Sequence, residues 1–297
     1  MTHDPRPFGR LLTAMVTPFA PDGSLDVEGA AKLASYLVDE QRNDALVISG
    51  TTGESPTTTD AEKDRLLRAV VEAVGDRAQV VAGVGTNNTA HTIELAHAAE
   101  KAGAHGLLVV TPYYNKPPQA GVERHFRAVA DVVGLPIVVY DIPHRAGVAI
   151  ATETMCRLAE HDRIVGVKDA KGDLTASSWV LARTGLAYYS GDDAATLPLL
   201  SIGGVGLVGT STHFTGPIAK EMIEAYERGD TAAALASHRR AMPLFTGIFR
   251  VPGTMLVKAG LRARGLPAGP VRSPLVDASD QELSQLRLDA SAAGLTL

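Results

Sequence analysis

Cysteine is nearly absent from this sequence, and so are long apolar runs and any excess of positive charge. Cys156 is the one cysteine among 297 residues, which excludes an internal disulfide framework and fits a reducing compartment. No run is apolar enough to span a bilayer, and residues 1–10 lack the pattern of a signal peptide. With a net charge of -5, the chain offers no basic patch for nucleic acid and no polybasic membrane anchor. We therefore expect a cytoplasmic protein without nucleic-acid or membrane partners.

The signatures of several enzyme classes are missing as well. The nine histidines form no H-E-x-x-H motif and no paired cysteines accompany them, so we expect no transition-metal site. The G-x-S-x-G elbow of serine hydrolases does not occur. Residues 204–209 match G-x-G-x-x-G, but they lie within a predicted strand, whereas the dinucleotide-binding motif needs a strand before it and a helix after it. We expect no nucleotide cofactor there.

Eight short apolar runs alternate with segments of helical spacing. The runs cover residues 12–19, 45–49, 80–85, 106–111, 136–140, 164–168, 186–190 and 205–210. Helical spacing occurs between them at 27–40, 61–74, 89–102, 121–133 and 152–160. Apolar strands separated by helices predict a parallel sheet buried on both faces, and eight such units predict an α/β fold of the (β/α)8 TIM barrel type. A doubly wound open sheet is the alternative.

After the eighth run the pattern is wholly helical. Helical spacing covers residues 217–228, 232–249, 253–264 and 280–293. No low-complexity tract or linker separates this part from the rest. We predict a catalytic barrel over residues 1–230 and a small C-terminal helical extension over residues 231–297 that packs on it.

Polar side chains follow four of the predicted strands. Thr51 and Thr52 follow the second, and Tyr113 and Tyr114 follow the fourth. Tyr140 ends the fifth, with Arg145 after it, and Lys168 ends the sixth. In a (β/α)8 barrel the carboxyl ends of all strands meet at one mouth, where active sites lie. We therefore expect these residues to converge.

Lys168 ends an apolar run. An amine in such a setting has a lowered pKa because desolvation penalises its charged form, and a neutral lysine attacks carbonyls. Alternation along a strand places Lys168 on the same face as Gly166 and Ile164, so the glycine leaves room for a small substrate beneath the amine. We interpret Lys168 as a Schiff-base lysine. The alternative is a strand-end lysine that points into solvent.

The loops after these strands carry groups that can bind a carboxylate or transfer a proton. Residues 50–54 (GTTGE) form a glycine-rich turn whose N–H groups and threonine hydroxyls fit a carboxylate, although a plain glycine turn with a helix cap has the same composition. Tyr113 and Tyr114 offer phenols for proton transfer or for stacking on a neighbouring chain, with packing as the alternative. Arg145 is suited to bidentate binding of a carboxylate.

Taken together and in order, these motifs resemble the dihydrodipicolinate synthase family. The matching segments are 50–55 (GTTGES), 113–117 (YYNKP), 140–143 (YDIP) with Arg145, 165–169 (VGVKD) and 190–193 (SGDD). The resemblance covers nearly the whole chain. It implies a pyruvate-dependent class I aldolase or lyase on a (β/α)8 barrel, a homotetramer built as a dimer of dimers, and pyruvate and aspartate semialdehyde as substrates. It implies no cofactor, because the substrate itself forms the covalent imine.

The resemblance also implies catalytic roles. Lys168 would form the imine with pyruvate, and Tyr140 would move protons to and from the reacting centre. Thr51 and Tyr114 would complete the proton relay, with Tyr114 reaching into the active site of the partner subunit.

Substrate-binding roles follow from the same resemblance. Thr51 and Thr52 would hold the pyruvate carboxylate, and Arg145 the carboxylate of aspartate semialdehyde. Backbone carbonyls of Gly191 and Val208 would line the site. Residues 206–213 depart from the usual family pattern at this wall of the pocket.

Two other functions remain open. The first is a related Schiff-base pyruvate aldolase or lyase with another aldehyde or a sugar acid as substrate. The second is a catalytically silent barrel that senses a small acid, which the intact set of Lys168, Tyr140, Thr51 and Tyr114 opposes.

The resemblance bears on feedback by lysine. In lysine-regulated family members the inhibitor lies near the positions of Pro56, Asp60, Lys63, Asn87, His91 and Tyr113. Asn87 and Tyr113 match the regulated pattern, but His91 replaces an acidic residue and Lys63 adds a like charge. We expect weak inhibition by lysine or none.

Overall fold

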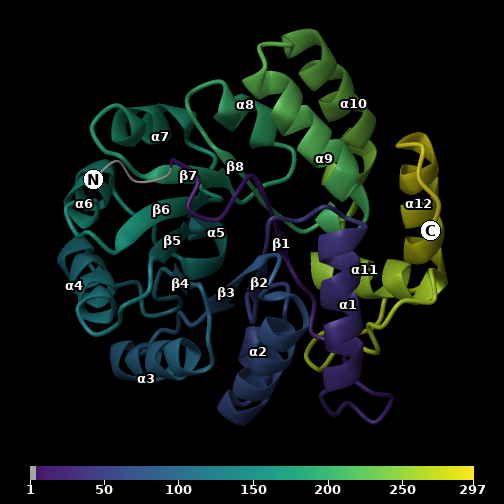
Figure 1. The fold of residues 1–297 in the computed structure, drawn as a ribbon, viewed down its shortest axis with the longest axis horizontal. Helices are drawn as coiled ribbons and strands as arrows, with labels where there is room; N and C mark the ends of the chain where they lie inside the picture. Colours follow the sequence, from purple (N-terminus) through teal and green to yellow (C-terminus); the bar gives the residue numbers. More distant parts are fainter. Residues whose placement is uncertain (1–4) are drawn as a thin grey trace.

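A closed barrel of eight parallel strands forms the centre of the computed structural model, which describes residues 5–297 (Figure 1). The strands are β1 (Leu11–Ala14), β2 (Ala45–Ile48), β3 (Gln79–Gly83), β4 (Gly106–Val110), β5 (Ile137–Asp141), β6 (Ile164–Asp169), β7 (Ala187–Ser190) and β8 (Gly206–Gly209). They pair in chain order, and β8 closes the ring on β1. The predicted (β/α)8 barrel is confirmed, and the open sheet is excluded.

Helices surround the strands. They are α1 (Val27–Asp39), α2 (Asp60–Val74), α3 (Thr89–Lys101), α4 (Gln119–Ala130), α6 (Thr152–Leu158), α7 (Leu174–Leu181), α8 (Thr196–Leu200) and α9 (Thr212–Glu227), with the short η1 (Ser55–Thr57) and α5 (Pro143–Ala146) in loops. A capping box between Thr59 and Glu62 starts α2. The predicted set did not include α7 and α8, because eight and five residues show little periodicity.

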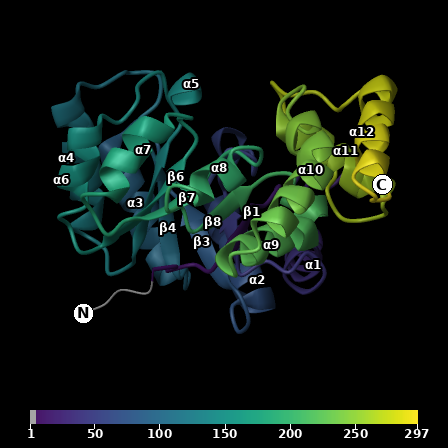
Figure 2. The ribbon, with the colours of Figure 1, turned by 90° about the horizontal axis from the view of Figure 1, so that it is seen from above.

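The C-terminal part adds α10 (Thr231–Gly247), α11 (Gly253–Ala263) and α12 (Asp280–Ala292). Figure 2 shows these helices on one side of the barrel, far from α4 and α6. α10 packs along α9, and α12 packs against α10 and α11. The division at residues 230 and 231 stays a prediction; it falls immediately before α10. Within residues 5–297, no helix has the length and apolar character needed to cross a membrane.

Two apolar layers hold the barrel together. Inside it, side chains such as Leu12, Val47 and Tyr189 form one cluster, and the Tyr189 hydroxyl accepts a hydrogen bond of 3.2 Å from Phe8 N. A larger cluster fills the space between the strands and the surrounding helices. This two-sided burial accounts for the continuous apolar runs of the strands.

A register shift in β6 changes the prediction made for the face of Lys168. Ile137 pairs with Ile164, but Val138 pairs with Gly166, so Val165 is bulged. Ile164 consequently packs in the outer layer, and the prediction that it shares the face of Lys168 is wrong, because a bulge interrupts the alternation. A Cβ on Gly166 would lie 2.7 Å from the Ala187 carbonyl oxygen. This glycine therefore allows β7 to approach closely and does not leave space for a substrate.

Candidate active site

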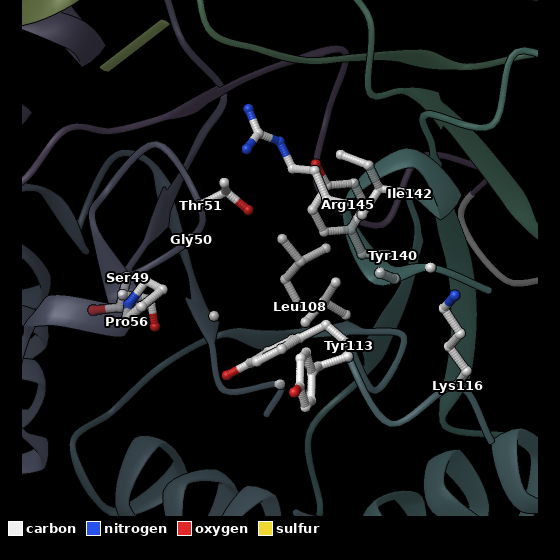
Figure 3. A pocket seen from close by; sticks show the side chains of 17 residues that line it. Ser49, Gly50, Thr51, Pro56, Leu108, Tyr113, Lys116, Tyr140, Ile142 and Arg145 are labelled. Atoms are coloured by element: carbon white, nitrogen blue, oxygen red, sulfur yellow. The ribbon is translucent and has the colours of Figure 1, made fainter. Parts of the chain in front are cut away.

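The carboxyl ends of the strands surround two adjoining cavities. The larger one, of about 910 Å³, lies between the barrel mouth and the C-terminal helices, and its lining includes Thr51, Thr52, Tyr140, Arg145, Lys168 and Gly191. The second has a volume of about 820 Å³ and shares Thr51, Tyr140 and Arg145 with the first. In Figure 3 these three side chains lie on one side of the second cavity and Tyr113 on the other. Six of the predicted site residues are thus brought together.

Lys168 lies deep in the larger cavity. The residue is only 5% exposed, and its Nζ is 4.2 Å from the centroid of the Tyr140 ring. Burial lowers the pKa of the Lys168 amine to about 8; Asp193 opposes this shift and the charge of Arg145 adds to it. Near neutral pH the fraction of neutral amine is therefore roughly a few hundred times that of an ordinary lysine.

Tyr140 stands next to Lys168 because the two residues pair across β5 and β6. Burial raises the pKa of the Tyr140 phenol to about 12, and Arg145 and a hydrogen bond with Thr51 limit the shift. The phenol is therefore protonated at neutral pH and is linked to a second hydroxyl. Such a pair can pass a proton between a reacting atom and the loop that carries Thr51.

Arg145 supplies positive charge at the mouth. It lies on α5 with its side chain exposed and lines both cavities. Within residues 5–297 its guanidinium makes no ion pair. A fork of N–H donors without a carboxylate partner is suited to binding an anionic ligand.

Tyr114 is placed differently from the other predicted catalytic residues. Its side chain is 88% exposed, its φ of 75° lies in the left-handed region, and its amide donates to the Ala146 carbonyl at 3.1 Å. It borders the smaller cavity only. Tyr114 therefore does not line the larger cavity, which contains Lys168.

Val208 lies apart from both cavities. It is 2% exposed and belongs to the cluster inside the barrel. The predicted role of its carbonyl stays a prediction. Gly191, in contrast, lies against the lysine stem, since a Cβ there would be 3.1 Å from Lys168 Cγ.

Sequence reasoning missed Asp193, which follows β7. Its carboxylate is fully buried, accepts hydrogen bonds from the amides of Ser211 at 2.9 Å and Thr210 at 3.2 Å, and acts electrostatically on Lys168. Burial raises the pKa of Asp193. The polar run Ser190-Gly191-Asp192-Asp193 at the end of β7 was the available signal.

Residues 206–213 form an ordered structure beside the larger cavity. Thr210 lines the larger cavity and its hydroxyl is 3.3 Å from that of Thr52. Behind it, His213 Nε2 accepts from Val16 N at 3.2 Å, and Nδ1 donates to the Thr210 carbonyl at 2.8 Å. Burial lowers the pKa of His213 to about 4, so the imidazole is neutral.

The sequence and the fold also match known proteins. A family model described as the dihydrodipicolinate synthetase family matches residues 7–293. The chain belongs to this family. Its members named 4-hydroxy-tetrahydrodipicolinate synthase include a protein of Acidothermus cellulolyticus, 70% identical over 98% of this chain and 94% of the relative. Another, from Streptomyces coelicolor, is 60% identical over 98% of this chain and 97% of the relative.

Solved structures of the dihydrodipicolinate synthetase family have the same fold. The lysine-bound enzyme of Cyanidioschyzon merolae superposes with a TM-score of 0.95 at 44% identity, covering 97% of this chain and 99% of that one. The pyruvate complex of the Acinetobacter baumannii enzyme gives a TM-score of 0.93 at 32% identity, covering 97% and 99%. The chain is therefore an enzyme, a lyase on a TIM barrel.

Proposed function

We propose that this chain condenses pyruvate with L-aspartate 4-semialdehyde to give 4-hydroxy-tetrahydrodipicolinate, in the biosynthesis of diaminopimelate and lysine. The observation that carries the proposal is the buried amine of Lys168, whose pKa is lowered to about 8, next to Tyr140 in a cavity with a free guanidinium at its mouth. The identity to relatives named for this activity supports the same reaction.

The chemistry begins at Lys168. Its neutral amine adds to the C2 carbonyl of pyruvate, and loss of one water gives the imine. Loss of a C3 proton converts the imine to an enamine, whose C3 attacks the aldehyde carbon of the second substrate. The amine of that substrate then adds to the imine carbon and displaces Lys168, which closes the ring. The two substrates thus give one product and one water, and no further cofactor is required.

Each of these steps moves a proton. Tyr140 lies next to the Lys168 amine and stays protonated near neutral pH, and its hydrogen bond to Thr51 extends the path. The partner subunit's Tyr114 would complete the relay, so the exposure of Tyr114 supports a tight dimer, and we propose that two such dimers form a homotetramer. Each dimer would then contain two mutually completed sites.

Substrate carboxylates have two binding places in this proposal. The hydroxyls of Thr51 and Thr52, with the backbone N–H groups of their turn, bind the carboxylate of pyruvate. Arg145 binds that of aspartate semialdehyde, because it carries the free charge at the mouth. Gly191 and the carbonyl of Val208 would border the reacting centre. We also place the enzyme in the cytoplasm, where Cys156 stays reduced.

A coupled assay tests the proposal. Purified enzyme is given pyruvate and aspartate semialdehyde, and the downstream reductase reports product formation. We expect turnover that requires both substrates. Turnover with another aldehyde or a sugar acid, and none with aspartate semialdehyde, would show a related aldolase instead.

A further inference from the structure

A buried ion pair joins the loop after β2 to the C-terminal helices. Lys258 Nζ on α11 lies 2.6 Å from Glu54 Oε1, and the two side chains are 0% and 2% exposed. Taking two charges out of water costs free energy that their attraction often only balances. The pair is therefore weakly explained by stabilisation of the fold alone. Its position beside the site suggests a second role.

Further contacts fix both members of the pair. Glu54 Oε2 accepts a hydrogen bond of 2.8 Å from Arg272 N. Lys258 Nζ donates to the Pro270 carbonyl at 2.7 Å and lies 4.1 Å from the centroid of the Phe19 ring. Two other segments, residues 270–272 and the chain at Phe19, thus contact the carboxylate or the ammonium. Neither side chain can move without losing charged hydrogen bonds in the interior.

The backbone of Glu54 depends on this anchorage. Its φ is 56°, in the left-handed region that residues other than glycine disfavour. In this conformation Glu54 N donates to the Thr51 carbonyl at 3.2 Å, and Ser55 N donates to the Gly50 carbonyl at 3.3 Å. The strained residue closes the turn that carries Thr51 and Thr52.

The same helix also holds this turn directly. Thr254 Oγ1 on α11 donates to the Thr52 carbonyl at 3.1 Å, and on the other side Thr17 Oγ1 donates to the Gly53 carbonyl at 2.6 Å. We propose that Glu54 and Lys258 are positioning residues, which lock the turn so that Thr51 and Thr52 present their donors to the pyruvate carboxylate. The inference rests on the proposed function, because it assumes pyruvate as the first substrate. It gives the C-terminal helices a role in substrate binding.

Imine trapping tests the proposal without the second substrate. Enzyme is incubated with increasing pyruvate, reduced with borohydride, and the trapped fraction is measured by mass. We expect Glu54→Gln to raise the pyruvate concentration for half-maximal trapping about tenfold, while trapping at saturation stays complete. Lys220→Met is the matched control, since Lys220 pairs with Asp44 at the same distance of 2.6 Å, but before β2, at the other end of the barrel. It should leave half-maximal trapping unchanged.

Glu54→Gln leaves the Lys258 charge buried without a partner, and this could unfold the protein. A second variant is therefore needed. The double variant Glu54→Gln with Lys258→Met removes both charges, and thermal melting shows whether it is folded. A folded double variant should show the same rise in half-maximal pyruvate. Half-maximal trapping equal to that of the wild type would overturn the positioning role, as would an equal rise in Lys220→Met. Absence of trapping in the wild type would overturn the proposed function instead.

Discussion

Lys168 and Tyr140 are neighbours across two strands, with the ammonium nitrogen 4.2 Å from the ring centroid. The register of β5 and β6 fixes this relationship, because Tyr140 and Lys168 are paired residues at the ends of these two strands. Burial acts on both groups in opposite directions: it lowers the pKa of Lys168 to about 8 and raises that of Tyr140 to about 12. Each group is thereby shifted toward its neutral form, in which the amine is a nucleophile and the phenol a proton donor.

The first prediction concerns pH. The neutral amine attacks pyruvate, so kcat/KM for pyruvate should rise with pH and level off near the lowered pKa of about 8. A lysine with an ordinary pKa would keep the rate rising to about pH 10. A pH profile of initial rates with limiting pyruvate checks this. A profile that still rises above pH 10 would show that the Lys168 amine is not perturbed.

The second prediction concerns the acceptor. Arg145→Ala should lower kcat/KM for aspartate semialdehyde about tenfold or more, because a hydrogen bond to a charged group contributes about 1.5–3 kcal/mol. Imine formation with pyruvate should be largely retained. Arg183→Ala, which removes a surface arginine paired with Glu153, serves as the control. Equal losses in the imine and the acceptor step would show that Arg145 has a structural role.

The third prediction places Tyr114 in the neighbouring site. Lys168→Ala and Tyr114→Phe chains should each be inactive, and mixing them under conditions that exchange subunits should restore part of the activity. One site of each mixed dimer then contains both groups. If mixed dimers form and no activity returns, Tyr114 serves the site of its own chain.

Much of this site was predictable, because barrel topology brings strand ends together whatever the details of the loops. Thr51 and Thr52 follow an apolar run, and Tyr140 and Lys168 each end one, which the sequence shows directly. The face of Ile164 was not predictable, since the bulge at Val165 interrupts the alternation on which the prediction rested. A bulge depends on pairing with β5 and leaves no local mark in the residues themselves.

Polar contacts between residues far apart in the chain could not be predicted from the sequence either. Glu54 was visible as part of a motif, but its partner Lys258 is 204 positions away and lies in an apolar helix. Asp193 was likewise visible, although only the fold shows that its carboxylate binds the amides of Thr210 and Ser211 behind the wall of the pocket. Which polar groups are buried together is decided by packing and cannot be read from spacing.

The fourth prediction concerns inhibition by lysine. His91 Nε2 lies 2.8 Å from Asp60 Oδ2, and Lys63 Nζ lies 3.9 Å from Asp60 Oδ1. The Asp60 carboxylate, which would bind the ammonium of an inhibitor lysine, is therefore already occupied by His91 and Lys63. The charge of Lys63 also repels that ammonium. We expect half-inhibition only above about 1 mM lysine, a concentration equivalent to roughly 4 kcal/mol of binding. An inhibition curve in the coupled assay measures it, and half-inhibition below that level would contradict the charge argument.

The most direct test of the account is the identity of the lysine that binds pyruvate. The enzyme is reduced with borohydride in the presence of pyruvate, digested, and mapped by mass spectrometry. We predict one reduced pyruvate adduct per chain, located on Lys168, and no adduct in Lys168→Ala. An adduct on Lys116 or Lys171, which also lie near the mouth, with Lys168 unmodified, would contradict the assignment of Lys168 as the Schiff-base residue.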